Sequence, residues 1–128
     1  MGVNETGRGL RAVALISAVY DFALGIPLLL APVAMAEMMG AGPVQPVING
    51  QLNGLFTFAL GLGYLWAARD VHARRGYLWI AGVFAKAAGS ALFVYDHFAR
   101  HSPESFLLFA ATDGTLAVVT LIALLRSR

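Results

Sequence analysis

The sequence predicts an all-α integral membrane protein, built as a four-helix bundle with both termini on the cytoplasmic side. Of its 128 residues, 59% are hydrophobic and only 12% are charged, and the mean hydropathy is +0.71. This composition lies well outside that of an ordinary soluble domain. The apolar residues fall into four runs of roughly 20 residues, each long enough to cross about 30 Å of hydrocarbon. Because these runs use up most of the chain, we predict a single transmembrane domain over residues 1–128.

Breaks in the apolar pattern set the bounds of the predicted helices. Pro27 and Pro32 bend or end the first helix. A short interfacial helix is expected over residues 33–39, and the glycines and prolines that follow it precede the second helix. A basic turn separates the second helix from the third, and the sequence Ser-Pro-Glu at 102–104 is typical of a helix start. The four predicted ranges are residues 10–30, 48–68, 77–97 and 105–125.

The first apolar segment also resembles a signal peptide. Basic residues precede it, and Ala34-Met35-Ala36 would be a suitable cleavage site. However, its apolar run is longer than a usual signal-peptide core and contains Asp21. We therefore expect it to be the first membrane span, with N-terminal cleavage as the alternative.

Basic residues predict the orientation in the membrane. Seven arginines lie in the N-terminal tail, the turn between the second and third helices, and the C-terminus, whereas the opposite side has only Arg100. By the positive-inside rule both termini are cytoplasmic, so we expect a multi-pass protein of the cell (inner) membrane. Tyr64 and Trp66, at the end of the second helix, are expected at the membrane interface. The seven arginines are Arg8, Arg11, Arg69, Arg74, Arg75, Arg126 and Arg128.

Composition and motifs exclude several classes of function. The formal charge is +2, but the basic residues form no patch, so no nucleic-acid partner is expected. The absence of cysteine excludes disulfides, thiolate metal sites and thiol redox chemistry. His97 and His101 are more typical of a solvated loop than of a metal site, which needs more ligands. No Ser/His/Asp grouping, phosphate-binding loop or zinc motif is present, so we predict no enzymatic activity, no cofactor and no metal.

Lys86, the only lysine, lies in the middle of an apolar helix. An unpaired ammonium there would be very costly, so we expect a buried partner. At 1.5 Å per residue, Asp21 and Lys86 lie about 15 and 13 Å from the cytoplasmic ends of their helices, and Asp113 lies about 12 Å from the outer end of its own. Asn53 enters from the outer side, roughly 7 Å deep. These groups should therefore converge between the midplane and the outer leaflet.

Each predicted helix has one edge of polar or small residues at helical spacing. Small residues let backbones approach and polar residues hydrogen-bond across, so these edges should face one another inside the bundle. The edges are Ser17, Asp21 and Gly25; Asn49, Asn53, Thr57 and Gly61; Gly82, Lys86 and Ser90; and Asp113 with Thr120. The candidates for binding a ligand or proton are Asp21, Asn53, Lys86 and Asp113, with Ser17, Asn49, Gln51, Thr57 and Ser90 around them.

The charged group has two interpretations. One lysine and two aspartates carry a net charge of −1 when all are ionised, which in a low dielectric favours keeping a proton or holding another cation. This interpretation predicts a proton-linked or ligand-binding site. In the other, Lys86 and an aspartate form an ion pair that only fixes the register of the helices.

In its layout the chain resembles, over nearly its whole length, the small four-helix bacterial membrane proteins described as DoxX-like. The stretches YDFALGIPLLLAP, AKAAGSALFVYDHF and ATDGTLAVV are similar in character to that group. Some of its members are implicated as membrane partners of quinone-linked oxidoreductases, and most have no known function. Since this chain has no cysteine and no mid-span histidine, the resemblance leaves any redox role to a partner.

Our leading hypothesis is a small bundle that binds or moves a small ligand or proton. The alternative is an accessory or structural subunit of a larger membrane complex, with no chemistry of its own. The resemblance implies that this complex is a redox complex. Besides lipid, we expect contact with a second copy or a larger complex through Ala81, Ala85 and Gly89 or through Gly50 and Gly54. An enzyme acting on lipid or quinone has the least support, because no nucleophile and base can be placed.

Overall fold

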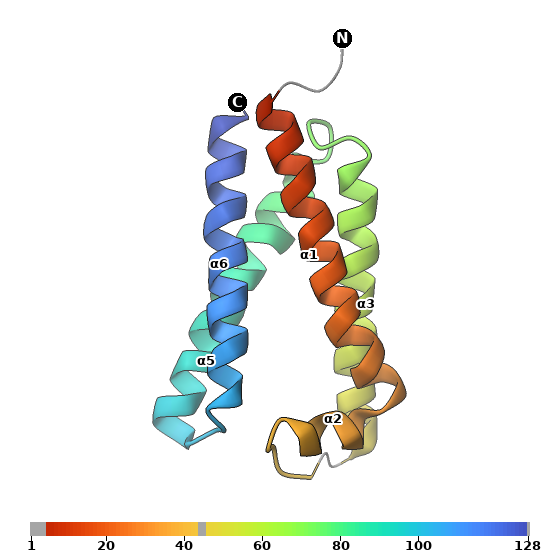
Figure 1. Cartoon of the computed structure of the whole chain (residues 1–128), viewed down its shortest axis with the longest axis vertical. Coiled ribbons are helices and arrows are strands. Elements are labelled where there is room, and N and C mark those ends of the chain that lie inside the picture. The colour runs from red at the N-terminus through yellow and green to blue at the C-terminus, as the bar shows by residue number, and fades with distance from the viewer. Residues whose placement is uncertain (1–4, 44–45, 128) are drawn as a thin grey trace.

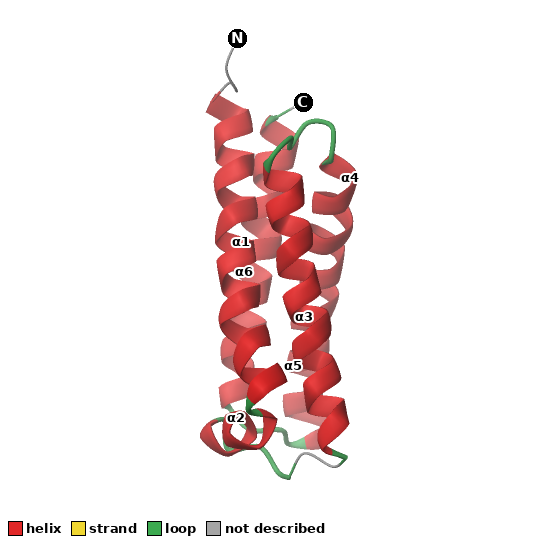
Figure 2. Ribbon diagram, turned by 90° about the vertical axis from the view of Figure 1, so that its right-hand side faces the viewer, coloured by secondary structure: helices red, strands yellow, loops and turns green. Residues whose placement is uncertain are grey.

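The computed structural model describes residues 5–43 and 46–127, and over these residues the chain is helical with no strand. The predicted all-α class is thereby confirmed. Loops join the helices at the two ends of an elongated molecule (Figure 2). The elements are α1 Glu5–Leu30, α2 Pro32–Met38, α3 Val47–Ala68, α4 Arg75–Tyr77, the π-helix η1 Leu78–Ala85, α5 Lys86–Arg100 and α6 Ser105–Arg126.

Three helices in the described part of the chain are long and apolar enough to cross a membrane: Gly7–Leu30, Arg75–Arg100 and Ser105–Arg126. Most residues of these spans face outward from the molecule, as lipid-facing helices require. The structure therefore supports a membrane protein, but with three candidate spans where the sequence predicted four. The helix that falls short is α3, which has 22 residues but carries three amides in its first two turns. These amides are Asn49, Gln51 and Asn53.

The helices form two pairs that meet at one end of the molecule and separate toward the other (Figure 1). α1 packs along α3, and α5 packs along α6. α1 begins and α6 ends at the same end, which we call the terminal end. The short helix α2 lies at the opposite end, the α2 end. At the α2 end, α1 and α3 stand apart from α5 and α6.

Glycines bring α1 and α3 together. A Cβ on Gly25 would lie 2.7 Å from the backbone nitrogen of Phe58, and one on Gly54 would lie 2.8 Å from the carbonyl oxygen of Gly25. Real Cβ atoms do not approach other atoms this closely, so neither position accepts a side chain without moving a backbone. Gly54, which the sequence offered as part of a contact with another subunit, therefore packs inside the chain.

α1 runs through Pro27 and ends at Leu30, the predicted end of the first helix, and α2 begins at Pro32. The amide of Ala31 donates to the carbonyl of Pro27 at 2.7 Å. The expected cap of the last helix by Ser102 is wrong. α6 begins at Ser105, and the Ser102 hydroxyl is buried with no hydrogen-bond partner among the described residues.

The third predicted helix contains a segment that the sequence did not predict. The chain is continuously helical from Arg75 to Arg100, but Leu78–Ala85 is π-helical, with i→i+5 hydrogen bonds. The helix ends at His101, which takes a left-handed conformation with φ 59°. The π-helix ends directly before Lys86, the first residue of α5.

The terminal end contains the packed core. Leu10, Ala14, Leu78 and Leu124 are fully buried and belong to one cluster. Tyr64 belongs to the same cluster at 1% exposure, so its side chain faces the interior of the chain. Trp66, by contrast, is exposed and lies under the guanidinium of Arg74, 4.5 Å from the ring centre.

At the terminal end, Arg75 links the start of α4 to the end of α6. Its Nη2 donates to the carbonyl of Leu124 at 2.9 Å, and its Nη1 donates to the hydroxyl and the carbonyl of Ser127 at 2.5 and 3.3 Å. These carbonyls lie at the end of α6, where helical hydrogen bonds run out and a cation is favoured. Arg75 therefore acts as a clamp on the last turn of α6.

Candidate functional site

A buried cluster of charged residues joins the two helix pairs. Lys86 Nζ donates to Asp21 Oδ1 at 3.2 Å and lies 4.0 Å from Asp113 Oδ1. Lys86 is 7% exposed, and the side chains of Asp21 and Asp113 are 4% and 18% exposed. The structure thus brings together the three charges that the sequence placed at one depth, and it identifies Asp21 as the closer partner.

Three different elements supply these side chains. Asp21 comes from α1, Lys86 from the first residue of α5, and Asp113 from α6. Close packing brings the third helix to α6, because a Cβ on Gly82 would lie 2.8 Å from Cγ2 of Thr120. π-helical turns are rare and concentrate at functional sites. The π-helix that precedes Lys86 is a structural sign of this site, and no residue pattern in the sequence indicated the π-helix.

Two tyrosines complete the surroundings of the ammonium. Lys86 Nζ lies 5.2 Å from the ring centre of Tyr20 and 5.4 Å from that of Tyr64, within the range of cation–π attraction. The hydroxyls of Tyr20 and Thr112 are 2.5 Å apart, which links α1 to α6 beside the cluster. Sequence reasoning missed both tyrosines. For Tyr64 a signal existed, because it continues the helical face of Thr57 and Gly61.

Several buried polar atoms near the cluster have no hydrogen-bond partner among the described residues. They are Asp21 Oδ2, Ser17 Oγ, Tyr64 Oη and Thr120 Oγ1. Buried polar groups are rarely left unpaired, because each loses its hydration without compensation. The one that matters most is Asp21 Oδ2, a carboxylate oxygen that can still accept a hydrogen bond while Oδ1 holds Lys86.

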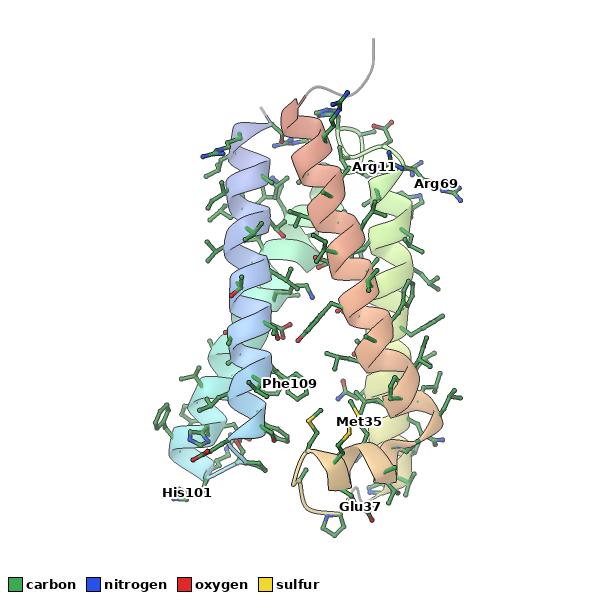
Figure 3. The ribbon with its side chains drawn as sticks, viewed as in Figure 1. Arg11, Met35, Glu37, Arg69, His101 and Phe109 are labelled. Atoms are coloured by element: carbon green, nitrogen blue, oxygen red, sulfur yellow. The ribbon has the colours of Figure 1, made fainter. Side chains whose placement is uncertain are left out.

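A cavity of about 510 Å³ runs from this cluster toward the α2 end, between the two helix pairs. Asp21, Lys86 and Asp113 line its inner end. Its other walls are largely apolar, and Figure 3 shows Phe109 of α6 and Met35 of α2 pointing into the space between the helix pairs. The apolar lining includes Leu24, Leu28, Pro32, Met35, Met39, Phe93, Phe106 and Phe109. This volume is typical of a small-molecule site.

The lining of the cavity includes some of the surrounding residues predicted from the sequence and leaves out others. Asn49, Asn53 and Thr57 line its α3 wall, and the Thr57 hydroxyl donates to the carbonyl of Asn53 at 2.8 Å. The remaining three residues, which were predicted to lie around the site, are not among the lining residues. These are Ser17, which is fully buried; Gln51, which is half-buried; and Ser90, whose hydroxyl donates to the carbonyl of Ala110 at 2.7 Å.

The small residues predicted for subunit contacts lie around the site. Ala81 and Ala85 line the cavity, as does Gly50. A Cβ on Gly89 would lie 3.8 Å from Asp113 Oδ2, so this glycine also faces the charged cluster. Contact with another subunit through these residues stays a prediction.

The two histidines of the α2 end lie outside the cavity lining. His97 Nδ1 is 2.8 Å from the carbonyl oxygen of Ser102, and His101 is exposed. In the described ranges, no group of three or more histidine, aspartate or glutamate side chains could hold a metal ion. His97 acts here in closing the turn before α6.

Comparisons with protein-family models, with curated proteins and with solved structures found no match to this chain. The resemblance to DoxX-like proteins stays a prediction.

Proposed function

We propose that this chain is a multi-pass membrane protein that binds a small molecule in the cavity between its two helix pairs. The polar end of the site consists of Asp21, Lys86 and Asp113, and Asn53 forms part of the α3 wall. The observation that supports this most is the convergence of a 510 Å³ cavity on a buried cluster with two carboxylates and one ammonium. A pair that only fixed helix register would need no cavity beside it.

The packing of α3 supports four membrane spans in place of three. α3 lies along α1, one of the candidate spans, so the two helices cross the membrane together. Two of the amides that lower its hydropathy, Asn49 and Asn53, line the cavity, where a polar group costs less than in lipid. In this arrangement the chain is a four-helix bundle.

The arginines support cytoplasmic termini. Arg11 and Arg69 lie at the terminal end (Figure 3), and Arg75 clamps α6 at the same end. Arg100 ends α5 near the α2 end. By the positive-inside rule the terminal end faces the cytoplasm, and the cavity lies in the outer half of the membrane. Arg128 lies outside the described residues.

Replacement of Lys86 tests the proposal. Lys86 Nζ holds Asp21 Oδ1 at 3.2 Å, so its loss frees a carboxylate that forms the polar end of the site. We expect Lys86→Met to misplace this end of the site and thereby remove the small-molecule mass that the wild-type protein retains when native mass spectrometry is done in a gentle detergent. Ala87→Met is the matched control, because Ala87 is exposed and lies outside the cavity lining. This control should retain the bound mass.

A double variant separates a binding role from a structural one. Removing one partner of a buried ion pair costs about 3–5 kcal/mol, so Lys86→Met alone could fail to fold. Lys86→Met with Asp21→Leu removes both charges and should fold but bind nothing. If the double variant folds and still retains the bound mass, or if the wild-type protein retains none, the proposal is wrong.

A further inference from the structure

The charges at the inner end of the cavity do not balance. In the described part of the lining, the charged residues are Asp21, Lys86 and Asp113. Lys86 is hydrogen-bonded to Asp21 at 3.2 Å and lies farther from Asp113, at 4.0 Å. When all three groups are ionised, one ammonium compensates two carboxylates, and a net charge of −1 remains where the surroundings are poor in water. A single positive charge brought by a ligand would neutralise it.

The hydrogen-bonding capacity of this end points the same way. Asp21 is 3% exposed and its Oδ2 is buried, whereas the Asp113 side chain, at 18% exposure, offers acceptor atoms to the cavity. A carboxylate oxygen only accepts hydrogen bonds, so the group that binds Asp113 must be a donor. The best match is a group that both carries positive charge and donates hydrogen bonds.

An anionic head group would find no free positive charge at this end of the cavity and would be repelled by a carboxylate. Its natural partner would be Lys86, but this ammonium is already bound to Asp21. An anion beside it would also face Asp113, whose Oδ1 is 4.0 Å from the lysine nitrogen. Like charges at such separations repel strongly in a partly desolvated site.

The rest of the cavity requires an apolar body. Leu24, Leu28 and Met35 line one side, and three phenylalanines line the other. Asp21 and Leu28 both line the cavity, and α1 rises roughly 10 Å over the seven residue steps from one to the other. A ligand that fills the cavity is therefore elongated. The phenylalanines are Phe93, Phe106 and Phe109.

We propose that the ligand is an amphipathic cation, with a protonated primary amine beside Asp113 and an apolar body along the phenylalanine wall. This inference rests on the proposed function, since it names the class of molecule that the same cavity binds. Its amine would donate to the Asp113 carboxylate, and its charge would offset the negative charge that Lys86 leaves uncompensated.

Binding of three single-chain probes tests the charge preference. Dodecylamine, dodecanol and dodecanoate share an apolar chain and differ in head-group charge. With the full chain in phosphatidylcholine nanodiscs at pH 7, we expect calorimetric titration to show dodecylamine binding at least tenfold more tightly than the other two. If none of the three binds although the wild-type protein retains a small-molecule mass, the cation inference is wrong and the proposed function stands. If no mass is retained either, the proposed function fails as well. If dodecanol or dodecanoate binds as tightly as dodecylamine, the cavity binds ligands but the cation inference is wrong.

Two variants test whether the preference arises at this cluster. Asp113→Asn removes one charge from the lining while keeping the Lys86–Asp21 pair, and should weaken dodecylamine binding about tenfold or more. The control, Asp96→Asn, removes a charge that is paired with Arg100 outside the cavity lining, and should leave binding unchanged. Equal effects of both variants, or none from Asp113→Asn, would overturn the assignment.

A free amine and an amine-bearing lipid share this head-group chemistry. Repeating the titration in nanodiscs that contain phosphatidylethanolamine distinguishes them. If the lipid lowers the apparent affinity for dodecylamine in the wild-type protein but not in Asp113→Asn, the natural ligand belongs to the bilayer. If it does not compete, the inference holds for a free amine.

Discussion

The two ends of this molecule are built from the same helices but packed in opposite ways. At the terminal end, Leu10, Leu78 and Leu124 are fully buried against one another's helices. At the α2 end, the same helices leave a cavity of about 510 Å³ between them. The charged cluster lies where the packed half meets the open half. The tight end holds the helices in place, and this allows the other end to stay open without losing the fold.

Side-chain size explains the difference. The core of the terminal end is rich in alanine, including Ala14, Ala18 and Ala67, which lets the helices approach closely. At the α2 end the phenylalanines pack against one another. Phe93 lies 5.5 Å from Phe109 and 5.9 Å from Phe106, measured between ring centres. Since these rings find partners within the α5–α6 pair, they do not draw that pair onto α1 and α3.

Identical leucine truncations should have very different effects at the two ends. Leu10→Ala would leave a hole in a packed core, which typically costs about 2–5 kcal/mol of unfolding free energy. Leu28→Ala only enlarges a cavity that is already present, so it should cost much less. Thermal unfolding in detergent measures both. Comparable losses of stability would show that the two halves are not packed differently.

Removing long-range hydrogen bonds should also destabilise the terminal end more than the α2 end. The difference in unfolding free energy should be smaller than for the leucine truncations. At the terminal end, Arg75→Met removes bonds to Leu124 and Ser127, and bonds to a charged group contribute about 1.5–3 kcal/mol. At the α2 end, Ser105→Ala removes one hydroxyl bond to the carbonyl of Met39, at 2.5 Å, which contributes about 1 kcal/mol.

Hydrogen exchange measures where each of these two changes acts. Arg75→Met should speed amide exchange in the last turns of α6, whereas Ser105→Ala should speed exchange only in α2 and the start of α6. If Ser105→Ala destabilises the protein more than Arg75→Met, the terminal end is not the more strongly held end.

Much of the helical layout could be predicted from the sequence. Helix α3 starts one residue before the predicted range 48–68, and α6 ends one residue after the predicted range 105–125. Apolar run length sets these bounds, and run length is written directly in the sequence. Asp21, Lys86 and Asp113 were placed together because a constant rise per residue converts sequence position into depth.

The cavity and its lining could not be predicted in the same way. Whether α5 and α6 close onto α1 and α3 depends on contacts between distant side chains, such as the packing of Phe93 on Phe106. The π-helix before Lys86 depends on tertiary packing as well, since Leu78–Ala85 is an ordinary apolar run. Tyr64 was assigned to the membrane interface because it is aromatic and near a helix end, but its face of α3 turns inward.

The most direct test of the account is whether the site can be reached from one side only. The chain has no cysteine, so single cysteines can be introduced without a background. Thr57 and Ala67 suit this test, because both belong to α3, but Thr57 lines the cavity and Ala67 is fully buried in the packed core. In oriented membrane vesicles, a charged, membrane-impermeant thiol reagent should label Thr57→Cys only from the side opposite the termini and should leave Ala67→Cys unlabelled from both sides. Labelling of Thr57→Cys from the side of the termini, or equal labelling of the two variants, would contradict a cavity that is open at the α2 end and closed at the terminal end.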